Sequence, residues 1–160
     1  MDEAERLHGL FMDLVRAGGL LQADQVVPGH PLSVSQAFAL HELDTGTPLS
    51  QRDLAERLRL EKSSVSRMAT EMERRGLLVR ERDPANRRLY RLRLTDEGRA
   101  LHAGMRGAFH HQYERWVGEM TPAEREALLV GLTAFIRVMR AGPTPWGPGT
   151  GGETDDSEQS

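Results

Sequence analysis

Residues 80–98, RERDPANRRLYRLRLTDEG, carry arginines at a density suited to contact with a polyanion. Six arginines fall within the first fourteen positions of this stretch. Between Arg52 and Arg93 the chain has thirteen Lys/Arg against seven Asp/Glu, although its formal net charge is −3. A basic middle in an acidic chain is the distribution expected where one face meets nucleic-acid phosphate. Taken alone, such a run is also compatible with an ordinary solvated surface.

A second set of polar side chains lies in KSSVSRMATEMERRGLL, residues 62–78, which has helical periodicity. At 100° per residue one side of this helix carries Val65, Met68, Ala69 and Met72, which predicts that this side faces a core. The opposite side carries Ser63, Ser66, Arg67, Thr70 and Arg74. Short hydroxyl side chains and guanidinium groups can approach a DNA groove and reach base edges and phosphates. An ordinary surface built from weak helix formers is the alternative.

The arginine-rich stretch is predicted to form a β-hairpin. LLVRERD and RRLYRLRLT alternate apolar and charged residues and flank DPANRR, which has turn-forming residues. The alternation directs Tyr90, Leu92 and Leu94 inward, with Arg91 and Arg93 outward and Arg87 and Arg88 at the loop. A two-helix unit followed at once by an arginine-tipped hairpin is the layout of a winged helix-turn-helix. The charge would then contact DNA phosphate and enter a minor groove.

Cap signals indicate the other helices. A hydroxyl residue is followed three positions later by a carboxylate or amide in the pairs Ser33/Gln36, Ser50/Asp53 and Thr121/Glu124. Thr95 is expected to cap a helix that begins near Asp96. The first helix, around residues 7–21, is expected to bend or stop at Gly18-Gly19. Two further breaks are predicted, at Gly46 and around residues 59–61.

The terminal helices have more apolar surface than a small winged helix needs for itself. Helical spacing places their apolar residues in stripes, which predicts an intermolecular helical interface. The residues expected at this dimer interface are Leu7, Leu10, Phe11, Leu128, Leu132, Phe135, Ile136 and Met139. Beyond Ala141 the sequence is rich in Gly, Pro and acids, and is predicted to be a disordered tail.

The sequence resembles MarR-type transcriptional regulators over about residues 7–140. The most specific segments are residues 49–84 and the wing motif, in which Asp-x-x-Asp-Arg-Arg followed by Leu-Thr-x-x-Gly is matched by Asp83, Asn86, Arg87, Arg88, Leu94, Thr95 and Gly98. Asn86 replaces an acid, so the wing is expected to be held mainly by Asp83. The resemblance implies a homodimer that binds pseudo-palindromic double-stranded DNA operators. It also implies a repressor that a small aromatic or phenolic effector releases from the operator.

The expected fold is therefore mainly α with a small β-hairpin. A winged helix-turn-helix at about 33–98 is embedded between dimerisation helices at about 1–22 and 99–141, within one domain of residues 1–141 that precedes the tail, residues 142–160. We expect DNA contacts from three groups of residues. They are Ser50, Gln51 and Arg52; then Ser63, Ser64, Ser66, Arg67, Thr70 and Arg74; and finally Arg87 and Arg88 at the wing.

Other function classes find little support. The chain has no cysteine, no glycine-rich phosphate loop and no H-E-x-x-H, so we expect neither an enzyme nor a cofactor. A metal-responsive regulator stays open as an alternative, with His41, His110 and Glu114 as its candidate ligands. A winged-helix module that binds protein but not DNA is the other alternative, and it predicts a broken wing or an acidic recognition face. No stretch approaches the roughly 18 apolar residues of a membrane span, so a cytoplasmic location is expected.

Overall fold

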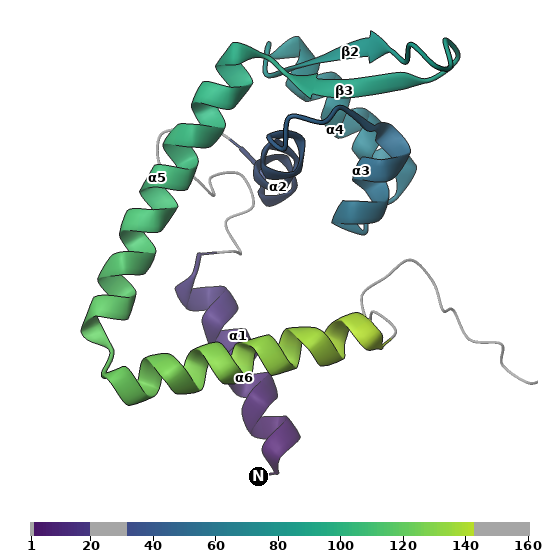
Figure 1. The fold of residues 1–160 in the computed structure, drawn as a ribbon. Coiled ribbons are helices and arrows are strands. Elements are labelled where there is room, and N and C mark those ends of the chain that lie inside the picture. Colours follow the sequence, from purple (N-terminus) through teal and green to yellow (C-terminus); the bar gives the residue numbers. More distant parts are fainter. Residues whose placement is uncertain (1, 20–31, 143–160) are drawn as a thin grey trace, which may run out of the picture. The chain divides into compact units, whose positions relative to one another are not determined.

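The computed structural model describes residues 2–19 and 32–142. Within these residues the structure has six helices and a small sheet (Figure 1), which confirms the expected mainly α class with a β-hairpin. The elements are α1 (Glu3–Ala17), α2 (Val34–Leu43), β1 (Leu49–Ser50), α3 (Gln51–Leu58), α4 (Lys62–Arg74), β2 (Leu78–Arg82), β3 (Tyr90–Leu94), α5 (Asp96–Glu119) and α6 (Pro122–Ala141). Leu21 lies outside the described residues, and so does the expected tail except for its first residue, Gly142.

The helix starts follow the cap signals. The capping boxes of α2, α3 and α6 each have both expected hydrogen bonds, from Ser33/Gln36, Ser50/Asp53 and Thr121/Glu124. At the start of α5, Thr95 Oγ1 accepts from the backbone N–H of Gly98 at 3.0 Å. Each bond satisfies an amide that the first helical turn would otherwise leave unpaired. A fourth box, between Asp2 and Glu5, begins α1 and was not predicted.

The helix ends also fall where turn residues predict them. The helix α1 stops at Ala17, directly before Gly18-Gly19, and Gly19 has a φ of +67°. The tight turn after α3 uses Arg59 in the left-handed region, with a φ of 53°. This turn separates α3 from α4 and so creates the two-helix unit.

The sheet has the order β1-β3-β2, with both pairs antiparallel. The β2–β3 hairpin was expected, and its register pairs Leu78 with Leu94 and Arg82 with Tyr90. The two-residue strand β1 was not predicted. Leu49 of β1 pairs with Leu92 of β3, so the start of α3 is tied directly to the wing strand.

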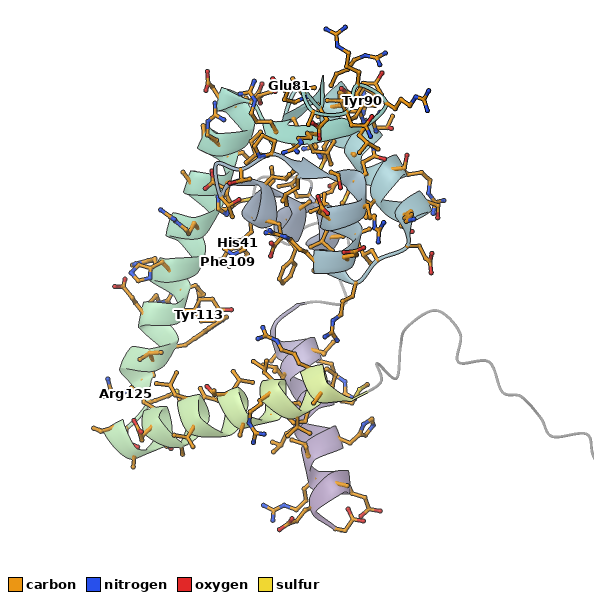
Figure 2. All side chains as sticks on the ribbon, turned by 45° about the vertical axis from the view of Figure 1, so that its right-hand side comes forward. His41, Glu81, Tyr90, Phe109, Tyr113 and Arg125 are labelled. Atoms are coloured by element: carbon orange, nitrogen blue, oxygen red, sulfur yellow. The ribbon has the colours of Figure 1, made fainter. Side chains whose placement is uncertain are left out.

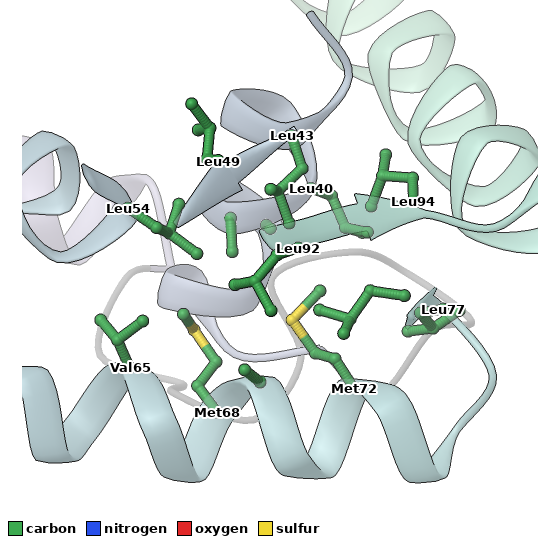
Figure 3. Packing of buried hydrophobic residues seen from close by; sticks show 14 of the residues in the cluster. Leu40, Leu43, Leu49, Leu54, Val65, Met68, Met72, Leu77, Leu92 and Leu94 are labelled. Atoms are coloured by element: carbon green, nitrogen blue, oxygen red, sulfur yellow. The ribbon is translucent and has the colours of Figure 1, made fainter. Parts of the chain in front are cut away.

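A single cluster of buried apolar residues holds α2, α3, α4, the sheet and the start of α5 together (Figure 3). The four α4 residues predicted to face a core, Val65, Met68, Ala69 and Met72, are all buried in it. Leu92 and Leu94 point into the same cluster, whereas Tyr90 remains 44% exposed. The inward assignment of Tyr90 was therefore wrong. Tyr90 is the first residue of β3, and this end of the strand extends past the core.

The chain divides into two compact units, residues 1–109 and 110–160. The first contains the winged helix region and the first part of α5, and the second contains the rest of α5 and α6. Neither α1 nor α6 has a buried residue. The domain boundaries drawn from the sequence stay a prediction.

Candidate nucleic-acid interface

The helix α4 presents a polar face opposite its buried residues. Ser63 and Arg67 are exposed on this face, and Ser64 and Ser66 are half-buried. Within the described residues the Arg67 guanidinium has neither an ion pair nor a hydrogen bond. The N-cap residue, Glu61, makes no side-chain cap, which leaves the first-turn amides of α4 available to an acceptor. A phosphate oxygen is an acceptor that fits such a helix start.

Two other residues of the predicted row already have partners within α4. Thr70 Oγ1 donates to the Ser66 carbonyl at 2.9 Å. Arg74 donates to both carboxylate oxygens of Glu71, at 2.7 and 2.9 Å. The Arg74 hydrogen bond lowers the pKa of Glu71, and Glu71 in turn raises the pKa of Arg74. Of the two arginines in the row, Arg67 is therefore the one that could bind a base without first giving up a carboxylate.

Ser50 and Arg52, at the start of α3, also have hydrogen-bond partners within α3. The Ser50 hydroxyl donates to the Asp53 carboxylate at 2.7 Å and accepts from the Asp53 N–H at 3.0 Å. Hydrogen bonds from Ser50 lower the pKa of Asp53. Arg52 donates to Glu56 at 2.8 Å, in an exposed pair that a phosphate can replace at little energetic cost.

Asp83 organises the wing loop. Its side chain is buried, and Oδ1 accepts from the backbone N–H of Ala85 at 2.7 Å and of Asn86 at 3.3 Å. Oδ2 accepts from Nε of Arg91 at 2.7 Å, which joins the loop to β3. The Arg91 hydrogen bond, followed by that from Ala85, lowers the pKa of Asp83. The carboxylate is therefore held in its charged form at the base of the wing.

Asn86 continues the loop without the acid of the family pattern. Its Oδ1 accepts from the Arg88 N–H at 3.1 Å, and its carbonyl accepts from the Leu89 N–H at 2.9 Å. The Leu89 carbonyl then accepts from the Asp83 N–H at 3.0 Å, which closes the loop. An amide oxygen can thus serve as the acceptor here.

The wing tip carries arginines with open guanidinium groups. Arg87 and Arg88 are exposed, and within the described residues their guanidinium groups make neither an ion pair nor a hydrogen bond. Arg82 was not singled out from the sequence. Its Nη1 donates to the Arg87 carbonyl at 2.7 Å, and its Cζ lies 5.1 Å from the centroid of the Tyr90 ring. Figure 2 shows nitrogen-tipped side chains extending from the hairpin near Tyr90.

Members of two of the three sets of predicted DNA-contacting residues, the start of α3 and Arg88 of the wing, line a common hollow on the first unit, which α4 borders through Glu73. This surface hollow has a volume of about 710 Å³. It is lined by Ser50, Gln51, Arg52, Glu73, Arg80, Arg88, Leu89 and Tyr90. The start of α3, one side of α4 and the hairpin therefore meet at one site.

The histidines adopt a different arrangement from the one considered for a metal. His41 Nδ1 lies 3.4 Å from Nε2 of His102, and His102 Nδ1 lies 2.7 Å from the Asp44 carboxylate. His110 pairs with Glu114 at 3.2 Å on α5. Among the described residues, no group of three or more His, Cys, Asp or Glu side chains is arranged to hold a metal ion.

The apolar stripes of the terminal helices are open in the single chain. On α1, Leu7, Leu10 and Phe11 are 45%, 67% and 38% exposed. On α6, Leu128, Leu132, Ile136 and Met139 are 38–48% exposed, and Phe135 is half-buried. None of the described helices is long and apolar enough to cross a membrane.

Comparisons with known proteins agree with this architecture. The family model described as "MarR family" matches residues 30–89. The HTH-type transcriptional regulator YdgJ of Bacillus subtilis is 30% identical over 109 residues, which are 66% of this chain and 64% of that protein. The chain thus spans just under two thirds of the length of this curated relative.

Two solved structures have the same fold. The PcaV transcriptional regulator of Streptomyces coelicolor, in complex with its natural ligand, is 27% identical and has a TM-score of 0.68; the match covers 88% of this chain and 96% of that one. FabT of Streptococcus pneumoniae, in complex with DNA, is 20% identical and has a TM-score of 0.69; the match covers 86% and 95%. Together with the two-helix unit and the Asp83-centred wing, these matches show that the chain has a winged helix fold similar to that of MarR-type regulators, whose family model matches residues 30–89.

Proposed function

We propose that this protein is a sequence-specific DNA-binding transcriptional regulator. The observation that carries the proposal is the common face formed by the polar side of α4 and the arginine-tipped wing. Arg67 on α4 and Arg87 on the wing have open guanidinium groups, and the start of α3, Glu73 of α4 and the hairpin line one hollow. A helix with such a face fits a major groove, and an arginine-tipped hairpin fits the adjacent minor groove. FabT, which shares the fold, is described in complex with DNA.

The regulator acts as a homodimer in this proposal. The exposed stripes on α1 and α6 are the surfaces that a second copy would cover, since apolar residues this exposed are favourable to bury. Two recognition helices related by a two-fold axis require a pseudo-palindromic operator. The domain of residues 1–141 predicted from the sequence would supply this interface.

A small molecule controls DNA binding in this proposal. PcaV is described in complex with its natural ligand, and the chain shares its fold at 27% identity. A repressor that leaves its operator when an aromatic or phenolic effector binds is the simplest scheme for such a protein. It requires no catalysis, cofactor or metal.

Selection of DNA duplexes from a random pool, followed by footprinting, tests the function. We expect an inverted repeat with half-sites about 10 base pairs apart, centre to centre. Affinity should fall steeply as salt rises, because bound arginines release counterions from the phosphates. A direct repeat or one protected half-site would contradict the two-fold dimer. Failure to enrich any duplex would contradict sequence-specific binding.

A further inference from the structure

Arg80 of β2 reaches from the wing strand to the recognition helix α4. One of its terminal nitrogens, Nη2, donates to the Ser66 carbonyl at 3.2 Å and to Thr70 Oγ1 at 2.8 Å. The other, Nη1, lies 3.4 Å from Oε2 of Glu73. The second carboxylate oxygen of Glu73 accepts from the Arg80 backbone N–H at 3.3 Å. Both the backbone and the side chain of Arg80 are therefore joined to α4.

The same guanidinium also faces the start of α3. With the Gln51 amide turned so that its oxygen faces Arg80, that oxygen accepts from Nε and Nη2, each at 3.3 Å. This orientation satisfies both groups, because the opposite one would set an NH₂ donor against guanidinium donors. Arg80 thus contacts each of the two helices of the helix-turn-helix while belonging to the wing.

The donors of Arg80 bond to other residues of the protein, and this distinguishes Arg80 from the arginines whose guanidinium groups are open to DNA. Its side chain is 23% exposed, and its guanidinium has partners on three residues of α4 and on Gln51. Arg87 and Arg88, by contrast, have open guanidinium groups. A planar group with five donors in a fixed fork can hold several acceptors at set angles, which a lysine ammonium cannot do.

We propose that Arg80 is a positioning residue that fixes the wing relative to α4, so that both elements can bind DNA at once. The inference rests on the proposed DNA-binding function. Two elements that enter different grooves must be held in a defined relation, and small displacements at a binding site weaken it strongly. Arg80 supplies this relation through Ser66, Thr70 and Glu73, without contacting the DNA itself. Thr70, expected from the sequence to contact DNA, becomes part of the link.

The first test measures affinity at several salt concentrations for the duplex that the wild-type protein selects from a random pool. Arg80→Met should weaken binding roughly tenfold, a size typical of coupled networks, and leave the salt slope unchanged. Arg80→Lys should bind the duplex almost as weakly as Arg80→Met, because a lysine ammonium keeps the charge but cannot replace the fixed set of guanidinium donors. Arg106→Met, at an exposed arginine of α5, is the charge-matched control. A slope flattened by about one ion per subunit and restored by lysine would instead make Arg80 a phosphate contact and overturn the proposal.

The second test asks whether the wing is displaced in the Arg80→Met variant. Arg87→Ala should weaken binding clearly in the wild-type background and much less in the Arg80→Met background, because a misplaced wing no longer reaches the minor groove. An equal loss in both backgrounds would overturn the proposal. If Arg80→Met does not fold, Thr70→Val removes one acceptor with the guanidinium retained, and it should give the same direction of coupling; no coupling there would also overturn it.

A third measurement separates failure of this inference from failure of the proposed function. If the wild-type protein selects no duplex, the proposed function fails, and amide hydrogen exchange in the DNA-free protein still tests the link. Hydrogen exchange of the β2 backbone amides, including the amide of residue 80, should be faster in Arg80→Met than in the wild type or Arg106→Met. Unchanged exchange would show that Arg80 does not hold the wing to α4.

Discussion

Oδ2 of Asp83 accepts a hydrogen bond from Nε of Arg91 at 2.7 Å, and this bond joins the wing loop to the strand that follows it. The same carboxylate accepts two backbone N–H groups of the loop. Asp83→Asn should therefore loosen the wing, because the amide cannot pair with the guanidinium and presents one acceptor in place of two. We expect a lower Tm and a loss of DNA affinity of about the size caused by Arg87→Ala.

Glu81→Gln is the matched control for this change. Glu81 also binds an arginine of β3, Arg93, but both side chains are nearly half exposed. Exposed ion pairs of this kind contribute little to stability. Thermal unfolding and duplex affinity should therefore change in Asp83→Asn and stay close to wild type in Glu81→Gln. Equal effects of the two substitutions would mean that Asp83 has no special role in the wing.

The stability that Asp83 contributes should depend on pH in one direction. Its folded-state pKa is lowered, chiefly by the Arg91 hydrogen bond, so folding favours the ionised form. The contribution is thus complete above the ordinary Asp pKa of about 4 and disappears as pH falls through the lowered folded-state value. The difference in Tm between wild type and Asp83→Asn should be constant from pH 7 to 5 and shrink below about pH 4. A difference that persists at the lowest pH where both proteins fold would contradict this linkage.

The glycine of the wing motif has a steric explanation in the structure. A Cβ built on Gly98 would lie 2.0 Å from the backbone carbonyl oxygen of Leu77, and no side-chain rotation can relieve this contact. Gly98→Ala should force α5 away from the turn before β2 and destabilise the protein by about 1–3 kcal/mol or more. Thermal or urea unfolding measures the effect.

Gly104→Ala on the same helix is the control for Gly98→Ala. A Cβ at Gly104 meets nothing within 4 Å. Alanine is the better helix former by about 0.5–1 kcal/mol, so this variant should be as stable as wild type or more so. If both substitutions stabilise the protein, the close approach of α5 to Leu77 is not present in solution.

Much of this architecture could be predicted because its signals are local. The capping boxes of α2, α3 and α6 each fit within four residues, and the four buried residues of α4 follow from helical periodicity alone. Gly98 was found as part of a motif, but its reason, the Leu77 carbonyl, lies in another element.

The features that sequence reasoning missed depend on contacts between distant residues. β1 has two residues, too few for any periodicity, and exists because Leu49 pairs with Leu92. The sequence assigned no role to Arg80, since nothing in its sequence neighbourhood indicates Ser66 or Thr70 as partners. Tyr90 was misplaced because strand alternation indicates a face of the sheet and not how far the core extends along it.

The proposed dimer predicts a strong effect of charge on one face of α6. Leu132→Asp would bury an unpaired carboxylate in the interface, and should yield monomer or unfolded protein and abolish duplex binding. Val130, two residues earlier, points to the opposite side of the helix and is 60% exposed. Val130→Asp should therefore remain dimeric. Size exclusion with light scattering decides between the two, and a dimeric Leu132→Asp that binds DNA normally would place the interface elsewhere.

Arg67 and Arg87 are predicted to act on DNA in different ways. Arg67 lies on the exposed face of α4, where a guanidinium can bond guanine in bidentate fashion. Arg67→Ala should weaken operator binding by about 1–3 kcal/mol and reduce discrimination among operator variants. Arg87 lies on the wing, and a minor groove offers little base information but a concentrated negative potential. Arg87→Ala should weaken binding evenly across sequences and flatten the salt dependence by about one ion per subunit.

The two effects should be nearly additive in the double variant, because Arg67 and Arg87 share no partner within the described residues. Binding isotherms at several salt concentrations, for each single variant, the double variant and Arg106→Ala, provide the comparison. Arg106→Ala removes the same charge from an exposed position on α5 and should leave sequence discrimination intact. An Arg87→Ala protein with unchanged affinity and salt slope would show that the arginine-rich hairpin is a solvated surface, and that α4 alone accounts for DNA binding.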